Sequence, residues 1–230
     1  WSTWTAIETE DGAVNMERTC SICGKTETAK IPDPCIGDKY CAGSAFDDMV
    51  SADSWAHEGI DYCVLFGLMS GVGNNLFDPD GMTTRAMLVS ILYRMAGEPD
   101  VSELPETPFE DVGPDAWYAD AVRWAYANEV AAGMDDTHFA PDDRLTRAQL
   151  VTMLYRAYGP EKGVRPRPIG GYTDWNTVPE WAYPAVTWAV SMGLLYGTSS
   201  TQLSPNAGAN RAQLAAFMMR ACELQSELDS

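Results

Sequence analysis

The stretch FAPDDRLTRAQLVTMLYR, Phe139–Arg156, decides how the rest of the chain is interpreted. It returns upstream as FDPDGMTTRAMLVSILYR (Phe77–Arg94) and downstream as LSPNAGANRAQLAAFMMR (Leu203–Arg220). The arginine inside each copy stands at 85, 147 and 211, at intervals of 62 and 64 residues (147 − 85 and 211 − 147), and a proline at 79, 141 and 205 keeps both intervals. A segment that recurs at nearly fixed spacing predicts a repeat protein with three copies.

Each copy has the pattern of two helices. We expect a tryptophan to begin the first helix, because apolar residues follow it at helical spacing: Trp55, Trp117 and Trp181. We expect that helix to end in a turn with a glycine in register, since glycine suits a left-handed closing residue: Gly71, Gly133 and Gly197. The second helix is predicted to follow an N-cap residue, with the repeated arginine one position later: Thr84, Thr146 and Asn210.

Composition limits the function. The 230 residues carry a net charge of −18 with only 15 Lys and Arg, which disfavours a nucleic-acid partner. An acidic ligand would therefore have to be held by a few placed cations. No apolar run is long enough to span a membrane. The motifs of common hydrolases and phosphate loops are absent, so we expect neither an enzyme nor a cofactor. The acid pairs Asp47-Asp48 and Glu110-Asp111 open their repeats, where loop and cap duty is expected instead of acid–base catalysis.

Residues 1–45 are expected to form a small β module, because they alternate polar and apolar residues around an Asp11-Gly12 turn signal. Such a module is too small to hold much of a core. Four cysteines lie in it: Cys20, Cys23, Cys35 and Cys41. Two disulfides would staple the module, and this is the favoured interpretation. The alternative is a zinc site, for which Cys20-x-x-Cys23 fits and the wider spacing of the other two fits poorly.

Two further cysteines, Cys63 and Cys222, belong to the first helix of copy one and the last helix of copy three. If the three copies close on themselves, the last packs against the first. A Cys63–Cys222 disulfide would then lock the arrangement. The alternative is a pair of buried free thiols.

Residues 46–224 resemble three tandem S-layer homology domains, with repeats at 46–98, 109–159 and 172–224. The resemblance rests on the tryptophan, the glycine, the Phe-x-Pro-x-x-x-hydrophobic-Thr-Arg-Ala pattern and the count of three. It also rests on the aromatic and acids that open each copy: Phe46-Asp47-Asp48, Phe109-Glu110-Asp111 and Tyr172-Thr173-Asp174. It implies a mainly α fold, a pseudo-threefold three-pronged spindle with grooves between repeats. Residues 1–45 more loosely resemble small Trp- and Cys-bearing modules of exported Firmicutes proteins.

The resemblance also implies an extracellular protein of the cell wall or S-layer of a Gram-positive bacterium. Such modules anchor their protein non-covalently by binding a secondary cell-wall polysaccharide, commonly one with a pyruvate ketal on an acidic terminal sugar. Three sets of residues carry over by position. The arginines would meet the ketal carboxylate beside free helix N–H groups: Arg85, Arg147 and Arg211. Trp55, Trp117 and Trp181 would face the sugar ring, and Gly71, Gly133 and Gly197 would let the backbone approach it. The plainer interpretations are that the arginines bridge aspartates and that the tryptophans are core.

The sequence departs from the family pattern in two respects. The glutamate that usually follows Thr-Arg-Ala is replaced by Met87, Gln149 and Gln213, and copy three has Asn210 and Leu203 for the usual Thr and Phe. We therefore expect at most two competent grooves. A competing function is a protein-interaction or self-assembly module of a surface array, and a third is the accessory region of an enzyme whose catalytic domain lies upstream.

Overall fold

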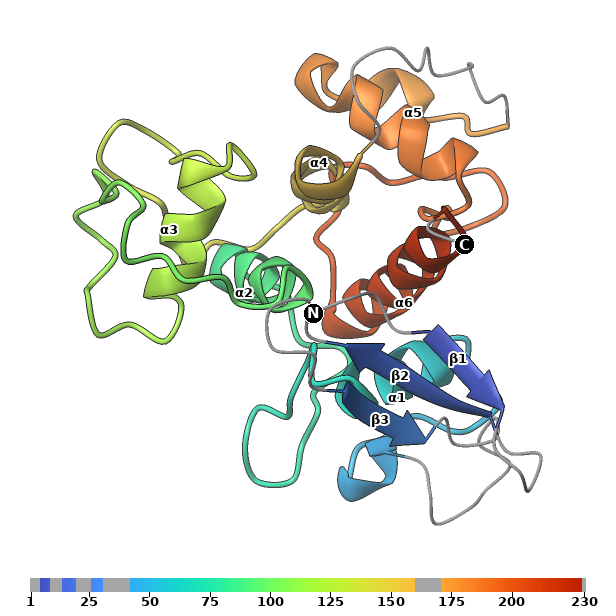
Figure 1. Cartoon of the computed structure of the whole chain (residues 1–230). Helices are drawn as coiled ribbons and strands as arrows, with labels where there is room; N and C mark the ends of the chain where they lie inside the picture. The colour runs from blue at the N-terminus through green and yellow to red at the C-terminus, as the bar shows by residue number, and fades with distance from the viewer. Residues whose placement is uncertain (1–4, 9–13, 20–25, 31–41, 160–170, 229–230) are drawn as a thin grey trace. The chain divides into compact units, whose positions relative to one another are not determined.

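The computed structural model describes residues 5–8, 14–19, 26–30, 42–159 and 171–228. Helices dominate the described part, with two in each repeat, as predicted (Figure 1). The six are α1 (His57–Leu65), α2 (Arg85–Met95), α3 (Ala119–Ala127), α4 (Arg147–Tyr158), α5 (Tyr183–Ser191) and α6 (Arg211–Leu228). Three short 3₁₀ turns accompany them: η1 (Ala42–Ala45), η2 (Trp175–Thr177) and η3 (Glu180–Ala182).

Three strands near the N-terminus form an antiparallel sheet in the order β1-β2-β3. They are β1 (Thr5–Glu8), β2 (Val14–Thr19) and β3 (Thr26–Lys30). In the register, Thr5 lies opposite Glu17 and Asn15 opposite Lys30. Cys20, Cys23, Cys35 and Cys41 lie outside the described residues. The choice between disulfides and zinc therefore stays a prediction, as does the independence of a module at 1–45.

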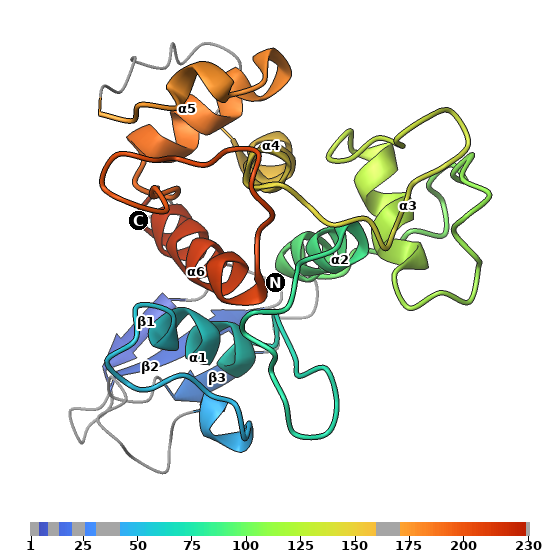
Figure 2. The same ribbon diagram turned by 180° about the vertical axis from the view of Figure 1, so that it is seen from behind.

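The chain divides into two compact units, one of Asp80–Leu214 and one of the chain up to Pro79 together with the residues from Ala215 onward. Within the first, α2 lies beside α3 and α4 beside α5 (Figures 1 and 2). An aromatic pair marks each contact, Tyr93 with Trp124 at 5.9 Å between ring centroids and Tyr155 with Trp188 at 5.4 Å. The second helix of one repeat therefore packs on the first helix of the next.

In the other unit, α1 lies beside α6, which again joins a first and a second helix of different copies (Figures 1 and 2). The helices touch closely at Gly59, where an added Cβ would come 2.6 Å from the Cα of Ala216. The thiol of Cys63 donates to the carbonyl of Ala215 at 3.5 Å. In sequence these helices belong to copies one and three.

The second helices begin at the predicted residues because the predicted caps form. The hydroxyl of Thr84 accepts the Met87 N–H at 3.3 Å, and the hydroxyl of Thr146 accepts the Gln149 N–H at 3.2 Å. Asn210 does the same with its side-chain oxygen for the N–H of Gln213, at 2.8 Å. Each capped donor is one that the helix leaves without an internal partner. The apolar stripes of these helices are buried, with six residues at their centre: Leu88, Leu92, Leu150, Leu154, Leu214 and Met218.

The first helices begin two residues later than predicted, at His57, Ala119 and Tyr183. The predicted face is correct within the helix, since Ala121, Trp124 and Ala125 are buried. It is wrong at its start, because the tryptophan of each copy stands outside the helix. In copies two and three a second tryptophan, Trp124 or Trp188, is buried on the face of the helix that packs against its neighbour.

Backbone hydrogen bonds join the three repeats in a cycle within the Asp80–Leu214 unit. Thr83 donates its N–H to Ala209, Ala209 to Leu145, and Leu145 back to Thr83, each at 2.9 Å. We call these three residues the backbone ring. A second cycle runs beside it, in which each repeated arginine donates its backbone N–H to a neighbouring copy: Arg85 to Asp143, Arg147 to Ala207 and Arg211 to Gly81. The repeats are therefore held together by main-chain bonds as well as by apolar packing.

Candidate functional site

The repeated arginines are buried at the first position of α2, α4 and α6, with exposed fractions of 4% for Arg85 and 6% for both Arg147 and Arg211. The Arg85 side chain reaches the loop of copy two. Its Nε donates to the carbonyl of Phe139 at 2.8 Å and its Nη2 to that of Ala132 at 2.7 Å. The guanidinium also lies 4.6 Å from the centroid of the Phe139 ring. We call Arg85, Ala132 and Phe139 the Arg85 junction.

Arg147 makes the equivalent contacts one repeat further along. Its Nε donates to the carbonyl of Leu203 at 3.2 Å, and its Nη2 donates to that of Tyr196. We call Arg147, Tyr196 and Leu203 the Arg147 junction. The backbone N–H of Arg211 donates to Gly81 at 2.8 Å in the same cycle. The plainer interpretation, a structural arginine that bridges aspartates, is wrong as to the partner for Arg85 and Arg147. Both form no ion pair with the described residues and hold main-chain carbonyls instead.

Burial dominates the electrostatics of both junctions. It lowers the pKa of the Arg85 guanidinium, and the carboxylates of Asp143 and Asp111 act in the opposite direction. Burial likewise lowers the pKa of Arg147, against Tyr172 and Asp174. An arginine stays protonated in either case and has five N–H donors, of which the two carbonyls take two. Each junction thus keeps a positive charge that is almost fully buried.

The tryptophans before the first helices are exposed, at 64% for Trp55, 64% for Trp117 and 54% for Trp181. The alternative that they belong to the core is therefore wrong. Trp117 stands edge-on to Tyr118, with 5.2 Å between ring centroids. An exposed indole offers a broad apolar face with a polar N–H at its edge, which suits one face of a sugar ring.

The repeated glycines do not close the first helices, so that prediction is wrong. None of Gly71, Gly133 and Gly197 has a positive φ, whereas Gly67 and Gly193, two residues after α1 and α5, do. Their role is close packing. A Cβ on each would come 2.5 to 2.6 Å from the ring of the aromatic residue that opens its repeat: Phe46, Phe109 and Tyr172. At these glycines the backbone comes close to an aromatic ring of the same protein, whereas the resemblance implied a close approach to the sugar.

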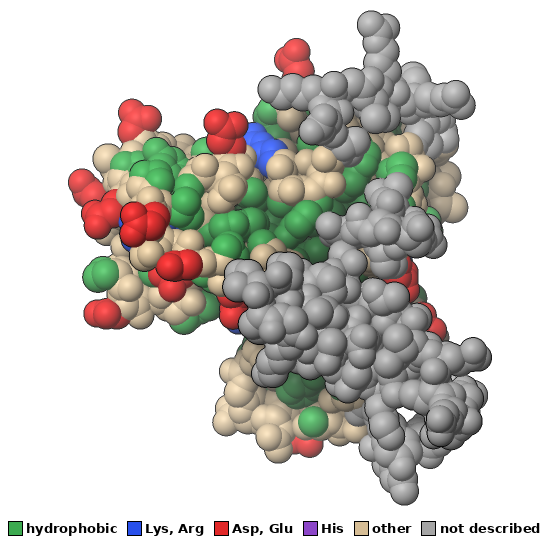
Figure 3. Space-filling model, in the orientation of Figure 1, with side chains coloured by type: hydrophobic (Ala, Val, Ile, Leu, Met, Phe, Trp, Pro, Cys, Tyr) green, Lys and Arg blue, Asp and Glu red, His purple; other side chains and the backbone are tan. Residues whose placement is uncertain are grey.

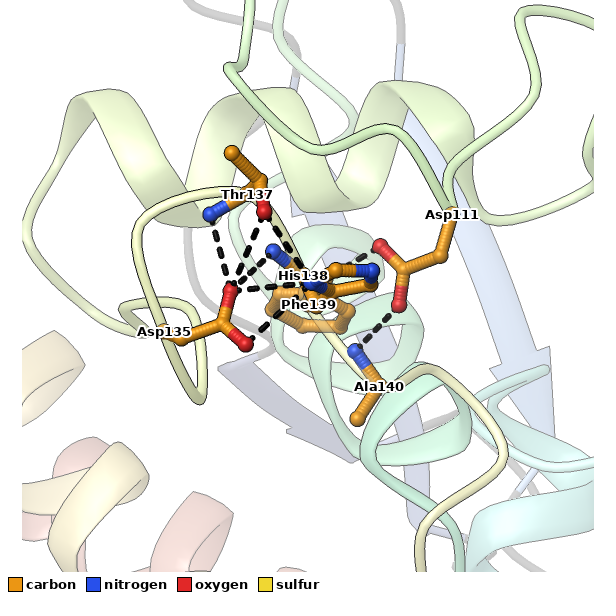
Figure 4. A network of polar contacts seen from close by, with 6 residues as sticks. All are labelled: Asp111, Asp135, Thr137, His138, Phe139 and Ala140. Carbon is orange, nitrogen blue, oxygen red and sulfur yellow. Dashed lines mark hydrogen bonds and ion pairs between the residues drawn. The ribbon is translucent and has the colours of Figure 1, made fainter.

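One aspartate per repeat holds the loop before the second helix. The carboxylate of Asp111 accepts the successive backbone N–H groups of Phe139 and Ala140 at 2.8 and 2.7 Å (Figure 4). Asp48 and Asp174 do the same in their repeats. This is the loop duty expected for the opening acids, and Asp174 extends it to copy three. The aromatic-x-Asp pattern in the sequence pointed to these aspartates. It did not show that their partners are two successive backbone N–H groups of the later loop.

Copy two has an exposed network around a carboxylate in the loop after α3. Figure 4 shows the Asp135 carboxylate facing Thr137 and His138, whose ring nitrogen lies 3.0 Å from it. A hydrogen bond to this carboxylate raises the pKa of His138. The pKa of Asp135 is lowered, first by the backbone N–H of Thr137. The network stiffens a surface loop.

The surface and the remaining side chains restrict what the site can be. On the face seen in Figure 3, acidic side chains stand around α3 and hydrophobic ones gather toward α2, with few basic groups among them. Among the described residues no cluster of three or more His, Cys, Asp or Glu could hold a metal ion. Across the same residues, no helix combines the length and apolar character that crossing a membrane requires.

Cys63 and Cys222 are both free cysteines in this structure, which agrees with the alternative of free thiols and not with the disulfide. Burial raises the pKa of the Cys63 thiol and brings that of Cys222 to about 11. Tyr62, the neighbour of Cys63 on α1, forms a hydrogen bond with the thiol of Cys222 on α6.

Comparison with known proteins agrees with this geometry. The S-layer homology domain matches residues 45–86, 108–151 and 171–215. Relatives include a surface-layer 125 kDa protein of Lysinibacillus sphaericus, 29% identical over 79% of this chain and 15% of that protein. Others are an S-layer protein of Bacillus thuringiensis subsp. finitimus, 24% identical over 85% and 23%, and an amylopullulanase of Thermoanaerobacterium thermosulfurigenes, 27% identical over 72% and 9%.

The chain thus spans less than a quarter of the length of these relatives. The family and its surface-layer relatives make it an extracellular, cell-wall or S-layer-associated protein. Since one domain matches more than half of its residues in three successive copies, the chain belongs to the S-layer homology domain family.

Proposed function

We propose that the chain is a non-catalytic module that anchors an exported protein to the bacterial cell wall by binding a secondary cell-wall polysaccharide. The carrying observation is that Trp55, Trp117 and Trp181 are more than half exposed in the same register. Each exposed indole presents an apolar face with a polar edge, which suits one face of a sugar ring, and it does so at the same position of every repeat. Their indole faces can each cover one side of a pyranose ring.

The Arg85 and Arg147 junctions supply the second half of the proposal. The charge of −18 repels an acidic polymer at long range, so affinity has to come from local contacts. Each junction has a guanidinium at a helix start, where the helix dipole favours a carboxylate, although the first backbone N–H groups of α2 and α4 are already bound to neighbouring carbonyls. We propose that a ketal carboxylate on an acidic sugar is bound at these two junctions. The arginines would then have two tasks, holding the loop by its carbonyls and meeting the anion with the donors that remain.

The main experiment is retention on isolated cell-wall sacculi before and after the polysaccharide is removed. We expect retention to disappear after removal and to fall strongly in a Trp117→Ala/Trp181→Ala variant. Because these side chains are exposed, the double variant should keep its helical content and its unfolding midpoint. Undiminished retention of the folded variant would contradict the proposal.

Arg147→Lys tests the charged group separately. Lysine keeps the charge and loses the planar fork that binds a carboxylate and two carbonyls. We expect weaker retention than wild type, with Arg94→Lys, a half-buried arginine at the other end of α2, as the matched control. Equal retention of Arg147→Lys and wild type would remove the arginine from the proposed site.

A surface-array function is the competing proposal, and the surface-layer names of several relatives favour it. An array module associates with itself without any polysaccharide. Analytical ultracentrifugation of the chain over a wide range of concentrations separates the two. Concentration-dependent assembly together with retention on stripped sacculi would support the array.

A further inference from the structure

The three repeats differ in how much negative charge they carry between the opening aromatic residue and the cap of the second helix. In copy two the acids of this segment are Glu110, Asp111, Asp115, Asp120, Glu129, Asp135, Asp136, Asp142 and Asp143. In copy one they are Asp47, Asp48, Asp53, Glu58, Asp61, Asp78 and Asp80. Copy three has only Asp174 and Glu180 in the corresponding segment, 172–210. An acidic polymer is therefore repelled least at copy three.

Copy three has neutral polar side chains in this segment, and they join its two loops. The side-chain amide of Gln202 donates to the hydroxyl of Thr173 at 2.9 Å, and that of Asn206 donates to the carbonyl of Thr177 at 2.8 Å. Both contacts connect the loop after α5 to the stretch that opens the repeat. Exposed hydroxyls and amides can exchange hydrogen bonds with sugar hydroxyls without repelling a carboxylate on the same polymer.

An aromatic pair belongs to the same part of copy three. The indole N–H of Trp175, in η2, donates to the hydroxyl of Tyr183, the first residue of α5, at 3.1 Å. The two rings stand edge-on, with 5.8 Å between their centroids. Tyr183 is 40% exposed, and Trp181, two residues before it, is one of the three exposed tryptophans. Because each ring of the pair holds the other in place, a ligand that covers them has less side-chain freedom to remove.

The other copies lack this pair. At the position of Trp175, directly after the loop aspartate, they have Met49 and Val112. At the position of Tyr183, two residues after the repeated tryptophan, they have His57 and Ala119. The exposed tryptophan of copy two also lies among acids, which stand around α3 in Figure 3. Copy three thus combines exposed aromatic rings with nearly neutral surroundings.

We propose that the polysaccharide docks mainly on copy three, on a surface formed by Trp175, Trp181, Tyr183 and the loops at 172–177 and 198–206. Neighbouring sugar rings of one chain cover Trp181 and the Trp175–Tyr183 pair, and the loops bind their hydroxyl groups. Arg147 holds the carbonyl of Leu203 within the second loop, so this surface adjoins the Arg147 junction. The inference rests on the proposed polysaccharide function and deepens it, because it makes the three repeats unequal.

Calorimetric titration of the whole chain with polysaccharide fragments cleaved from sacculi tests the aromatic contacts. We expect Trp175→Ala/Tyr183→Ala to weaken binding about three- to tenfold, the size of one lost aromatic contact. Met192→Ala removes another exposed apolar side chain, at the far end of α5, and is the matched control that should leave the affinity unchanged. Circular dichroism checks that both variants are folded.

A second pair of variants tests the charge. Asn176 and Gly113 are exposed and equivalent, since each lies two residues after the loop aspartate of its repeat, and a Cβ on Gly113 would meet nothing within 4 Å. We expect Asn176→Asp to weaken binding about two- to fivefold at low salt, with a loss that shrinks as salt screens the repulsion. Gly113→Asp adds the same charge to copy two and should change little. Equal losses in the two variants would overturn the preference for copy three.

The remaining outcomes separate the inference from the function beneath it. If the wild type does not bind the fragments, the proposed function fails. If the wild type binds them and folded Trp175→Ala/Tyr183→Ala binds equally well, the function stands and docking on copy three is wrong. Sedimentation of the same variant covers another occupant of this surface, a second copy of the chain. Self-association that the double variant loses, with its affinity for the fragments unchanged, would make the surface a contact between copies and would also overturn the inference.

Discussion

At the scale of single residues, the repeated tryptophan, arginine and glycine have different structural roles. The tryptophans are exposed to solvent, Arg85 and Arg147 are buried against main-chain carbonyls, and the glycines make room for an aromatic ring. Repetition in the sequence identifies the positions that all three copies share. The role of each residue follows from its burial and from its contacts, many of which are with other copies.

The glycine packing gives a direct stability prediction. Gly133→Ala would place a Cβ 2.6 Å from the Phe109 ring and 2.8 Å from the carbonyl of His138. We expect a loss of about 1–3 kcal/mol in the free energy of unfolding, as for other overpacked sites. Gly113→Ala is the control, since its Cβ meets nothing within 4 Å. Urea unfolding of both variants measures the difference, and equal midpoints would contradict the packing role.

The loop aspartates predict a pH dependence. Backbone N–H groups, that of Leu203 foremost, lower the pKa of Asp174. A carboxylate with a lowered folded-state pKa contributes stability that is complete above its unfolded pKa of about 4 and is lost as the pH falls through the folded value. Asp174→Asn should therefore be less stable than wild type at pH 7, with a gap that stays constant down to about pH 4 and narrows below it.

Chemical unfolding at a series of pH values measures this gap. Glu180→Gln removes the same charge from an exposed residue of the same repeat and serves as the control. A gap that stays constant down to pH 2 would show that the ionised carboxylate is not what holds the loop.

At the scale of elements, the sequence predicted what local chemistry decides. The starts of α2, α4 and α6 follow from Thr84, Thr146 and Asn210, whose side chains bond within their own helix turn. The apolar stripes of those helices were predictable for the same reason, as their spacing is a property of one helix. The family match then supplied the number and type of repeats.

What the sequence left open depends on distant partners. The start of α3 was placed two residues early because Trp117 fits the helical spacing and only its exposure shows otherwise. The carbonyls bound by Arg85 lie 47 and 54 residues away and leave no local pattern. Of the candidate site, the residues were therefore predictable from repetition, and the contacts of the arginines and glycines were not.

The caps provide a test at this scale. Thr146 and Gln149 form a reciprocal capping box on α4, with the Thr146 N–H donating to Gln149 at 2.9 Å. Thr146→Ala should cost about 1 kcal/mol of unfolding free energy, the usual value of an N-cap. Thr146→Ser keeps a hydroxyl acceptor and should restore most of it. Thermal unfolding compares the three proteins, and an alanine variant as stable as wild type would show that the cap is dispensable.

At the scale of the whole molecule, Cys63 of copy one and Cys222 of copy three are both free thiols in this structure. We therefore expect both to react with an alkylating reagent in urea without reductant. Peptide mapping measures this, and the Cys63 and Cys222 peptides should each appear labelled and separate. Unlabelled peptides that appear linked would contradict the free thiols.

The backbone ring has a consequence for how such chains can be shortened. A fragment that ends before copy three would leave the Thr83 N–H without an acceptor and the Leu145 carbonyl without a donor, both at buried positions. A fragment of two copies would therefore keep unpaired main-chain groups in its interior, which costs free energy unless another molecule pairs with them. We expect such a fragment to associate with other molecules or to unfold.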